Sequence, residues 1–420
     1  VNNQYLAEYK TDFGGSGHNL NVLAGYEMYK LKEQFLEGQN DHLFNPLVGE
    51  LGNADGVSSR QTSSYTADYM TQGFLARVQY EYGNKYFASA SYRRDGSSRF
   101  APGHRWGNFG SVGAAWLISN ESFMSGAGWI SMLKLKASYG VQGNDNLYPN
   151  ANYARKYYPY SDNYTHSYNE GTGEYSTELD YKGNNELTWE SSHSFNTGID
   201  FELFGNRLNG SAEYFSRKTV DLLYSKDVPL SAGNPTGYYP VNVGSIVNNG
   251  FELTLEGILI NTSAMQWSLN MNLSHYRNRI LSLDPSVSEE GIKGGNYIYK
   301  IGGSLYEAYM RKYAGVNPEN GKAQWYRKVL DEDGTWTGES EITETFADAS
   351  QYELGSVLPK LYGGFGTTFK ACGFDLSAQF SFQLGGRYYD GTYQALMHTS
   401  SGIGTAWHKD VLDSWSETNK

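Results

Sequence analysis

The sequence predicts an all-β protein: a transmembrane antiparallel β-barrel with short turns at one rim and long loops at the other. Two observations predict it. Apolar residues occupy every second position in twelve stretches, and the connectors between those stretches alternate between short and long. A side-chain period of two gives each strand one apolar and one polar face. In a membrane barrel the apolar face meets lipid and the polar face lines the lumen.

The alternation predicts twelve strands. They cover 4–10, 18–28, 69–81, 86–95, 107–117, 131–141, 192–203, 208–217, 249–258, 266–276, 361–370 and 374–384. In the third, apolar residues from Phe74 to Tyr80 alternate with Arg77, Gln79 and Glu81. Runs of this kind, bounded by turn residues, are typical of strands with two different surroundings.

The connectors sort by parity. The odd ones are short and cover 11–17, 82–85, 118–130, 204–207, 259–265 and 371–373. The even ones are mostly long and cover 29–68, 96–106, 142–191, 218–248 and 277–360. Antiparallel strands place all odd connectors at one rim, and short periplasmic turns with long extracellular loops are the rule for outer-membrane barrels. A soluble sandwich has no reason to sort its loops in this way.

Aromatic residues gather near the predicted strand ends. Tyr80, Tyr82 and Tyr86 flank one short turn, and Phe201 and Phe204 flank another. Tyrosine favours the headgroup layer of a membrane because its ring is apolar while its hydroxyl can hydrogen-bond. The sequence therefore predicts aromatic belts at the edges of an apolar band, although packing between neighbouring strands would explain each site alone.

Composition narrows the class further. The chain has 420 residues, 15% of them aromatic, and a mean hydropathy of -0.57. No apolar run approaches the roughly 18 residues that a transmembrane helix needs, whereas a barrel strand needs only about 9 to 11. The net charge of -12 and the absence of basic runs argue against a nucleic-acid partner. The one cysteine, Cys372, is expected to occupy a turn.

Several segments resemble the SusC/RagA family of TonB-dependent outer-membrane transporters. They are YFASASYRRDGSSRF (86–100), SYGVQGND (138–145), LTWE (187–190), VGSIVNNGFELTL (243–255), YAGVNPENG (313–321) and a stretch over 358–390 that contains LPKLYGGFGTTF and FDLSAQFSFQLGGRYYD. Together they run through most of the chain in family order. The resemblance implies a barrel of about 22 strands, an N-terminal TonB box and a plug inside the lumen.

The count of twelve strands then predicts that residues 1–420 are part of such a barrel, without its plug or its last strands. The resemblance also implies a location in the outer membrane of a Gram-negative bacterium, in contact with its lipid. It implies energy coupling to TonB–ExbB–ExbD through an N-terminal part outside these residues, and a SusD-like surface lipoprotein as partner. The expected activity is import of oligosaccharides or peptides.

Ligand contact is expected in two of the long connectors. The loop 142–191 interleaves tyrosines with amides and charges, and its candidates are Tyr157, Tyr158, Tyr160, Asn163, Tyr164 and Tyr168, with Tyr153 and Arg155 beside them. The loop 218–248 adds Tyr238 and Tyr239. Rigid aromatic plates beside amides suit the C–H faces and hydroxyls of sugars, and they also suit peptides. The alternative is that these tyrosines pack the loop on itself.

No catalytic site, metal site or cofactor is expected. The eight histidines are scattered without metal-ligand spacing, and no paired acid and base forms a local motif. The loop Asp331-Glu332-Asp333-Gly334 has the oxygen density of a calcium loop but lacks the full ligand pattern, so a tight Asp-Gly turn is the simpler interpretation.

Two alternatives to a SusC-like importer stay open from the residues alone. One is a siderophore or cobalamin TonB-dependent receptor with the same architecture. The other is a soluble all-β carbohydrate-binding or adhesive protein whose tyrosine-rich loops do the binding. An enzyme is not expected.

Overall fold

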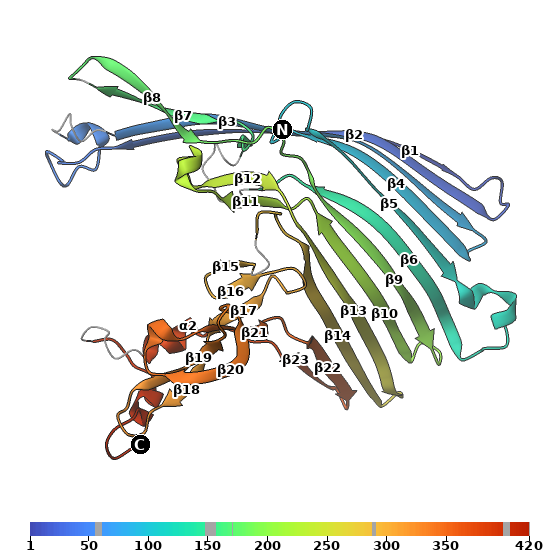
Figure 1. Cartoon of the computed structure of the whole chain (residues 1–420). Helices are drawn as coiled ribbons and strands as arrows, with labels where there is room; N and C mark the ends of the chain where they lie inside the picture. Colours follow the sequence, from blue (N-terminus) through green and yellow to red (C-terminus); the bar gives the residue numbers. More distant parts are fainter. Residues whose placement is uncertain (55–60, 148–156, 170, 288–290, 398–403, 420) are drawn as a thin grey trace. The chain divides into compact units, whose positions relative to one another are not determined.

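The computed structural model in Figure 1 describes residues 1–54, 61–147, 157–169, 171–287, 291–397 and 404–419. The chain forms two compact units, Val1–Ser245 and Ile246–Lys420. Strands dominate both units. In the described part of the chain, no helix combines the length and the apolar character needed to cross a bilayer.

All twelve predicted strands are present in one twelve-stranded sheet, so the predicted strand set is confirmed. The hydrogen-bonded order is β1-β2-β3-β4-β5-β6-β9-β10-β13-β14-β22-β23. Their bounds are β1 Asn2–Thr11, β2 His18–Gln39, β3 Gln61–Tyr82, β4 Tyr86–Ser97, β5 Trp106–Leu117, β6 Ile130–Asn144, β9 Glu190–Leu203, β10 Leu208–Val220, β13 Ser245–Asn261, β14 Met265–Ser282, β22 Leu361–Ala371 and β23 Phe374–Leu384. Strands β1 to β6, β9 and β10 of the first unit lie side by side in a curved sheet (Figure 1).

The register in the first unit joins the apolar positions into continuous rows. One row runs across six strands through Val22, Val78, Ala90, Val112, Tyr139 and Phe195. The next row, one residue along, belongs to the other face and runs through Asn21, Gln79, Ser89, Gly113, Ser138 and Asn196. A slip of one residue would exchange the two rows, so the two different surroundings fix the register.

Among the described residues, many large side chains of the apolar face are exposed. Val112 is 57% exposed, and Phe74 and Tyr139 are 53% and 45% exposed. Monomeric soluble proteins rarely expose such continuous apolar surface. A lipid-facing wall explains this exposed apolar surface, because acyl chains of the membrane, rather than a protein core, then shield the side chains from water.

Short turns join the strands at one rim. Between β3 and β4, Gly83 and Asn84 both have positive φ, 60° and 54°, and Lys85 N donates to Tyr82 O at 3.0 Å. This is the type I′ geometry that matches the twist of two paired strands. Cys372 and Gly373 repeat it between β22 and β23, with φ of 53° and 82°, so the predicted turn position of the cysteine is confirmed.

Two aromatic rows border the apolar band of the first unit. At the short-turn rim, ring centroids are 4.4 Å apart for His18 and Tyr82, 6.3 Å for Tyr82 and Tyr86, and 6.4 Å for Tyr86 and Trp116. On the same face, Phe74 lies 5.1 Å from Tyr26 and 6.3 Å from Trp106. Phe74 and Tyr82 are eight residues apart on β3, which at roughly 3.4 Å per residue is about 27 Å along a tilted strand. That spacing suits an apolar band roughly 25 Å high.

A carboxylate anchors the short-turn row. Glu121 lies between two 3₁₀ turns, Ile118–Asn120 and Ser122–Met124. It accepts hydrogen bonds from Tyr86 OH at 2.5 Å, Lys85 Nζ at 2.9 Å and Trp116 Nε1 at 3.1 Å. These donors, with Tyr86 the strongest, lower the pKa of Glu121 from its ordinary value of 4.5 to about 2.

We expect Glu121→Gln to lower the melting temperature at neutral pH by removing the charged acceptor. A carboxyl group whose pKa is lower in the folded state stabilises the protein above its unfolded pKa. Its contribution is lost as the pH falls from 4.5 through about 2. The check is the melting temperature of both forms from pH 7 to pH 2. The difference should shrink below pH 4.5, and a constant difference would contradict this account.

The long connectors carry their own small sheets, which the sequence did not predict. In the first unit β7 (Asn163–Asn169) pairs with β8 (Glu174–Tyr181), and β11 (Leu223–Asp227) pairs with β12 (Tyr238–Asn242). In the second unit the order β15-β16-β17-β21 forms one sheet and β18-β19-β20 another. Their bounds are β15 Ile292–Gly294, β16 Tyr297–Tyr299, β17 Glu307–Arg311, β18 Tyr313–Val316, β19 Ala323–Leu330, β20 Trp336–Thr343 and β21 Gln351–Ser356; a short helix, α2, covers Gly391–Leu396.

The predicted loop at 29–68 is wrong in its extent. β2 continues to Gln39 and β3 begins at Gln61, and the two strands pair without interruption from His18↔Tyr82 to Gln39↔Gln61. The apolar alternation changes phase beyond Met28: Lys30 and Lys32 occupy the face that was apolar, while Leu31 and Phe35 lie on the opposite face. Backbone pairing continues through this change, since a ladder needs no apolar side chains.

Candidate ligand-binding surface

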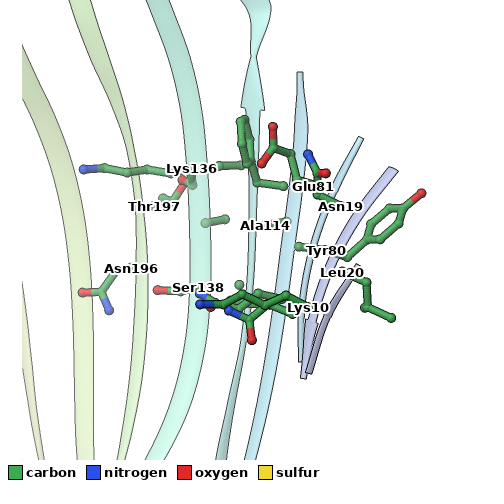
Figure 2. A pocket seen from close by; sticks show the side chains of 18 of the residues that line it. Lys10, Asn19, Leu20, Tyr80, Glu81, Ala114, Lys136, Ser138, Asn196 and Thr197 are labelled. Carbon is green, nitrogen blue, oxygen red and sulfur yellow. The ribbon is translucent and has the colours of Figure 1, made fainter. Parts of the chain in front are cut away.

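The polar face of the first unit holds a large hollow, shown in Figure 2. Its volume is about 1090 Å³, and its lining includes Gln79, Ser89, Ser138 and Asn196 from the polar row. In Figure 2, Tyr80 and Leu20 point to the opposite side of the strands from Ser138 and Asn196. The lining also contains charged residues, among them Lys10 and Glu81, and small apolar residues such as Ala114, so the hollow has a mixed character.

Two cations on this face, Lys136 and Arg93, form ion pairs with carboxylates. Lys136 Nζ lies 2.8 Å from Asp200 Oδ1 and 2.5 Å from Glu213 Oε1. Arg93 lies 2.7 Å from Glu27 and 2.7 Å from Asp95. Each cation therefore lies between two carboxylates. At these two positions the positive charge is compensated.

A buried polar cluster, formed by Tyr69, Ser97, Arg99 and Asp145, fixes the roots of two long connectors. Asp145 pairs with Arg99 Nη1 at 2.9 Å and accepts from Ser97 Oγ at 2.6 Å and Tyr69 OH at 2.9 Å. The Arg99 guanidinium lies 4.4 Å above the Tyr69 ring. Ser97 and Arg99 are 1% and 8% exposed, so this root cluster belongs to the small core of the unit.

Aromatic packing extends the root cluster. The Trp189 ring lies 5.4 Å from Phe100 and 5.3 Å from Phe109, and its Nε1 donates to Arg105 O at 2.9 Å. A Cβ at Gly143 would lie 2.1 Å from the Phe109 ring, so only glycine allows this approach. The segments 86–100, 138–145 and 187–190, which carry much of the family resemblance, therefore meet at one place. In this structure, the three segments pack together where the long connectors leave the strands.

Two of the predicted ligand tyrosines pack against the β2–β3 hairpin. Tyr157 is 1% exposed, and its hydroxyl donates to Glu33 Oε2 at 2.7 Å. The Tyr158 hydroxyl donates to Asp68 O at 3.2 Å and accepts from Asp68 N at 2.9 Å. For these two tyrosines, the contacts favour a packing role over ligand contact. Tyr153 and Arg155 lie outside the described residues.

Tyr160 and Tyr239, predicted from two different connectors, border the same cavity. This loop hollow has a volume of about 480 Å³ and is also lined by Asp162, Lys182, Asn185 and Glu186. The Asn184 side chain ties the two connectors together by donating from Nδ2 to Pro240 O at 2.8 Å. The structure thus brings together aromatic, amide and charged groups that are far apart in sequence.

Two residues that line the loop hollow, Asp162 and Lys182, form an ion pair. Asp162 Oδ2 lies 2.7 Å from Lys182 Nζ, and its Oδ1 accepts from Gly183 N at 2.9 Å. The hydrogen bond to Asp162 raises the pKa of Lys182, which therefore stays charged. A Cβ at Gly183 would lie 2.5 Å from the Ser161 backbone, so the close approach of these two segments requires glycine.

The remaining predicted residues lie around this hollow without lining it. Tyr164 and Tyr168 are on β7, 55% and 54% exposed, and Tyr168 packs against Tyr175 of β8 with ring centroids 4.8 Å apart. Asn163 begins β7, and its buried Nδ2 meets no acceptor in the part of the chain that the structure describes. Tyr238 adjoins Tyr239 in β12 and pairs with Asp227.

The sequence prediction missed Lys182, Asn185 and Glu186. They follow β8 in the run Lys182-Gly-Asn-Asn-Glu186, which is a turn signal and carries no chemical motif. The hydrogen bond from Asn184 to Pro240 places this turn beside Tyr239. Their proximity depends on tertiary structure, so no local pattern contained it.

The acidic loop between β19 and β20 is a tight turn. Asp331 Oδ1 accepts from Asp333 N at 3.1 Å and from Thr335 N at 2.7 Å, and Gly334 has a φ of 79°. The carboxylate is used within the turn, which confirms the Asp-Gly interpretation. Among the described residues, no group of three or more His, Cys, Asp or Glu is placed to hold a metal ion.

The family profile described as "TonB dependent receptor-like, beta-barrel" matches residues 1–396. This chain belongs to that family. Membership confirms the transmembrane barrel fold and decides against a soluble carbohydrate-binding protein. Family barrels of this kind reside in the outer membrane.

Relatives within the TonB-dependent receptor family support the predicted SusC/RagA resemblance. TonB-dependent receptor P39 of Formosa agariphila is 31% identical over 314 residues, 75% of this chain and 29% of that protein. TonB-dependent receptor SusC of Bacteroides thetaiotaomicron is 29% identical over 324 residues, 74% of this chain and 30% of that protein. The structure of the RagAB peptide transporter matches with a TM-score of 0.84 and 25% identity, covering 100% of this chain and 45% of that one.

The chain spans less than half the length of these relatives: 29% of P39, 41% of TonB-dependent receptor P3 of the same organism and 45% of the RagAB chain. The barrel wall and loop bases described above are therefore features of this chain. The activity of a whole transporter is a separate matter.

Proposed function

We propose that the protein containing this chain is an outer-membrane importer of oligosaccharides or peptides in a Gram-negative bacterium. Its energy comes from TonB–ExbB–ExbD, and a SusD-like surface lipoprotein is its partner. The observation that carries the proposal is the family match over residues 1–396, together with relatives named SusC and RagAB. This chain contributes barrel wall, polar lumen surface and long loops.

The polar wall supports import of an uncharged or mixed-charge solute. Amides and hydroxyls lie beside charged groups in the large hollow, where Lys136 is compensated by Asp200 and Glu213 and Lys10 by Glu8. The relatives named SusC and RagAB favour this activity over siderophore or cobalamin import, the alternative within the wider family. We therefore place the protein with the nutrient importers.

Within this proposal, the loop hollow is the first ligand contact on this chain. Tyr160 and Tyr239 supply flat apolar faces, and Asn185 and Lys182 supply hydrogen-bond donors beside them. Sugars and peptides both offer apolar faces flanked by polar groups. Tyr164 and Tyr168 of the β7–β8 hairpin are exposed and offer two further aromatic side chains on the same connector.

Uptake tests the proposal directly. Cells expressing the full-length protein and its partner lipoprotein are given a fluorescent oligosaccharide pool and, separately, a fluorescent peptide pool. Periplasmic accumulation of at least one pool is expected, and it should require TonB. Accumulation that persists in a strain without TonB would refute energised import, and accumulation of neither pool would refute the ligand class.

We expect Tyr239→Ala and Tyr160→Ala each to weaken ligand binding about ten-fold, because one aromatic stacking contact contributes roughly 1 to 1.5 kcal/mol. The measurement is the concentration that gives half-maximal uptake by the full-length protein. Tyr313→Ala is the matched control, since Tyr313 is 57% exposed on β18 and does not line the hollow. Equal effects of all three substitutions would show that the loop hollow does not contact the ligand, and they would not contradict import itself.

A further inference from the structure

The second unit contains a separate cavity near the end of β23. Its volume is about 380 Å³, within the usual range for small-molecule sites. The cavity is walled by β16, β17, β21 and residues 386–389, and its lining includes Tyr297, Met310, Leu354, Arg387, Tyr388 and Tyr389. Neither the barrel wall nor the loop hollow of the first unit uses these residues.

Arg387 gives this cavity its chemical character. It is the one charged residue among the lining residues, the others being apolar, aromatic or neutral. Its Nη1 donates to Leu354 O and its backbone N donates to Val357 O at 3.1 Å, so the arginine is held against the cavity wall. Among the described residues, no carboxylate forms an ion pair with it, whereas Arg93, Arg99 and Arg327 all have one.

A guanidinium has five N–H donors in a planar fork, and one is used here. The free edge of the fork matches the two oxygens of a carboxylate. The charge limits the ligand as well. One uncompensated positive charge balances a monoanion and leaves a phosphate monoester, with its nearly double negative charge, only partly neutralised.

The rest of the cavity favours an aromatic body. Tyr388 and Tyr389 follow Arg387 directly, and Tyr297 lies on the neighbouring strand β16 with Ala308 of β17 as its cross-strand partner. Aromatic rings pack well against one another in offset or edge-to-face arrangements. Met310 adds an adaptable apolar surface that fits irregular ligands.

Glycine shapes the entrance. Gly386 has a φ of 84°, and a Cβ there would lie 2.8 Å from Val357 O and 3.0 Å from the Pro359 backbone. A larger residue would push the 386–389 segment away from Val357 and Pro359 and displace Arg387. The position of the cation therefore depends on glycine at 386.

We propose that this cavity binds an aromatic monocarboxylate, with its carboxylate on Arg387 and its ring among Tyr297, Tyr388 and Tyr389. The proposal is independent of import, because it concerns binding to the protein whether or not transport occurs.

The test uses the full-length protein in detergent and two probes of the same size, 3-phenylpropionate and its neutral amide. Binding is measured by saturation-transfer NMR titration, with protein-free micelles as blank. We expect the carboxylate to bind about ten-fold more tightly than the amide, since a charge-assisted hydrogen bond exceeds a neutral one by roughly this factor.

Two variants assign the effect. Arg387→Gln should abolish the preference for the carboxylate, while Tyr388→Ala should weaken both probes equally; Tyr388 is 83% exposed, so its loss should not unfold the unit. Arg327→Gln is the control, because Arg327 is an exposed arginine on β19 that is paired with Glu341. Equal binding of both probes, an unchanged preference in Arg387→Gln, or no binding because another part of the full chain fills the cavity would each overturn the proposal.

Discussion

Replacing Arg99 with alanine is expected to destabilise the first unit by about 3 to 5 kcal/mol, the usual cost of removing one partner of a buried ion pair. The substitution leaves Asp145 charged, 13% exposed and without its cation. It also removes the cation that lies 4.4 Å above the Tyr69 ring. Since Arg99 lies in the 96–106 connector and Asp145 in the 142–191 connector, the bases of both should loosen together.

The measurement is urea unfolding of the full-length protein in detergent, followed by limited proteolysis of the 142–191 connector. Arg327→Ala is the matched control, because its pair with Glu341 is about half exposed on both sides and such pairs contribute roughly 0 to 1 kcal/mol. Asp145→Asn should resemble Arg99→Ala. If Arg99→Ala unfolds at the same urea concentration as Arg327→Ala, the root cluster does not hold the loops.

The barrel wall could be predicted because the two faces of each strand have different surroundings. Where lipid lies on one side and water on the other, every second residue must be apolar, and that period is visible in the sequence. Val78 and Gln79 illustrate this, since they are adjacent in sequence and belong to opposite faces. The strand ends at the short-turn rim were also predictable, because Gly83-Asn84 and Cys372-Gly373 mark tight turns.

The loop sheets could not be predicted in the same way. Almost all residues of β7 and β8 are exposed on both faces, so nothing imposes a period of two on them. The length of β2 and β3 was underestimated because the apolar residues change face beyond Met28, where Leu31 and Phe35 fall out of phase with the alternation that marks the inner half.

The candidate site shows a similar division. A tyrosine-rich loop was evident, but which tyrosine packs and which faces a cavity depends on distant partners. Tyr157 packs inward, where its hydroxyl donates a hydrogen bond to Glu33, which is 124 residues away in the sequence. Tyr160 lines a cavity because the hydrogen bond from Asn184 to Pro240 joins the 142–191 connector to the 218–248 connector. The family segments are informative for the same reason, since three of them have one packing site in common at the base of these loops.

Substituting Val112 with arginine should destabilise the folded protein in lipid by about 2 to 4 kcal/mol, the cost of placing that charge on the lipid face near the membrane midplane. Val112 belongs to the row through Val78, which lies midway between the aromatic rows marked by Phe74 and Tyr82. Its side chain is 57% exposed on the apolar face, so crowding by neighbouring residues contributes little to the expected loss.

Ser138→Arg is the control at the same height. Ser138 is the cross-strand partner of Gly113, the residue next to Val112, and it lines the polar hollow, where water can solvate the new charge. Urea titration of the full-length protein in lipid vesicles, read by the gel mobility difference between folded and unfolded barrel, separates the two variants. A large loss for Val112→Arg with little loss for Ser138→Arg assigns lipid to the apolar face. Equal losses would mean that the two faces see the same surroundings, and the membrane orientation inferred from the alternation would then fail.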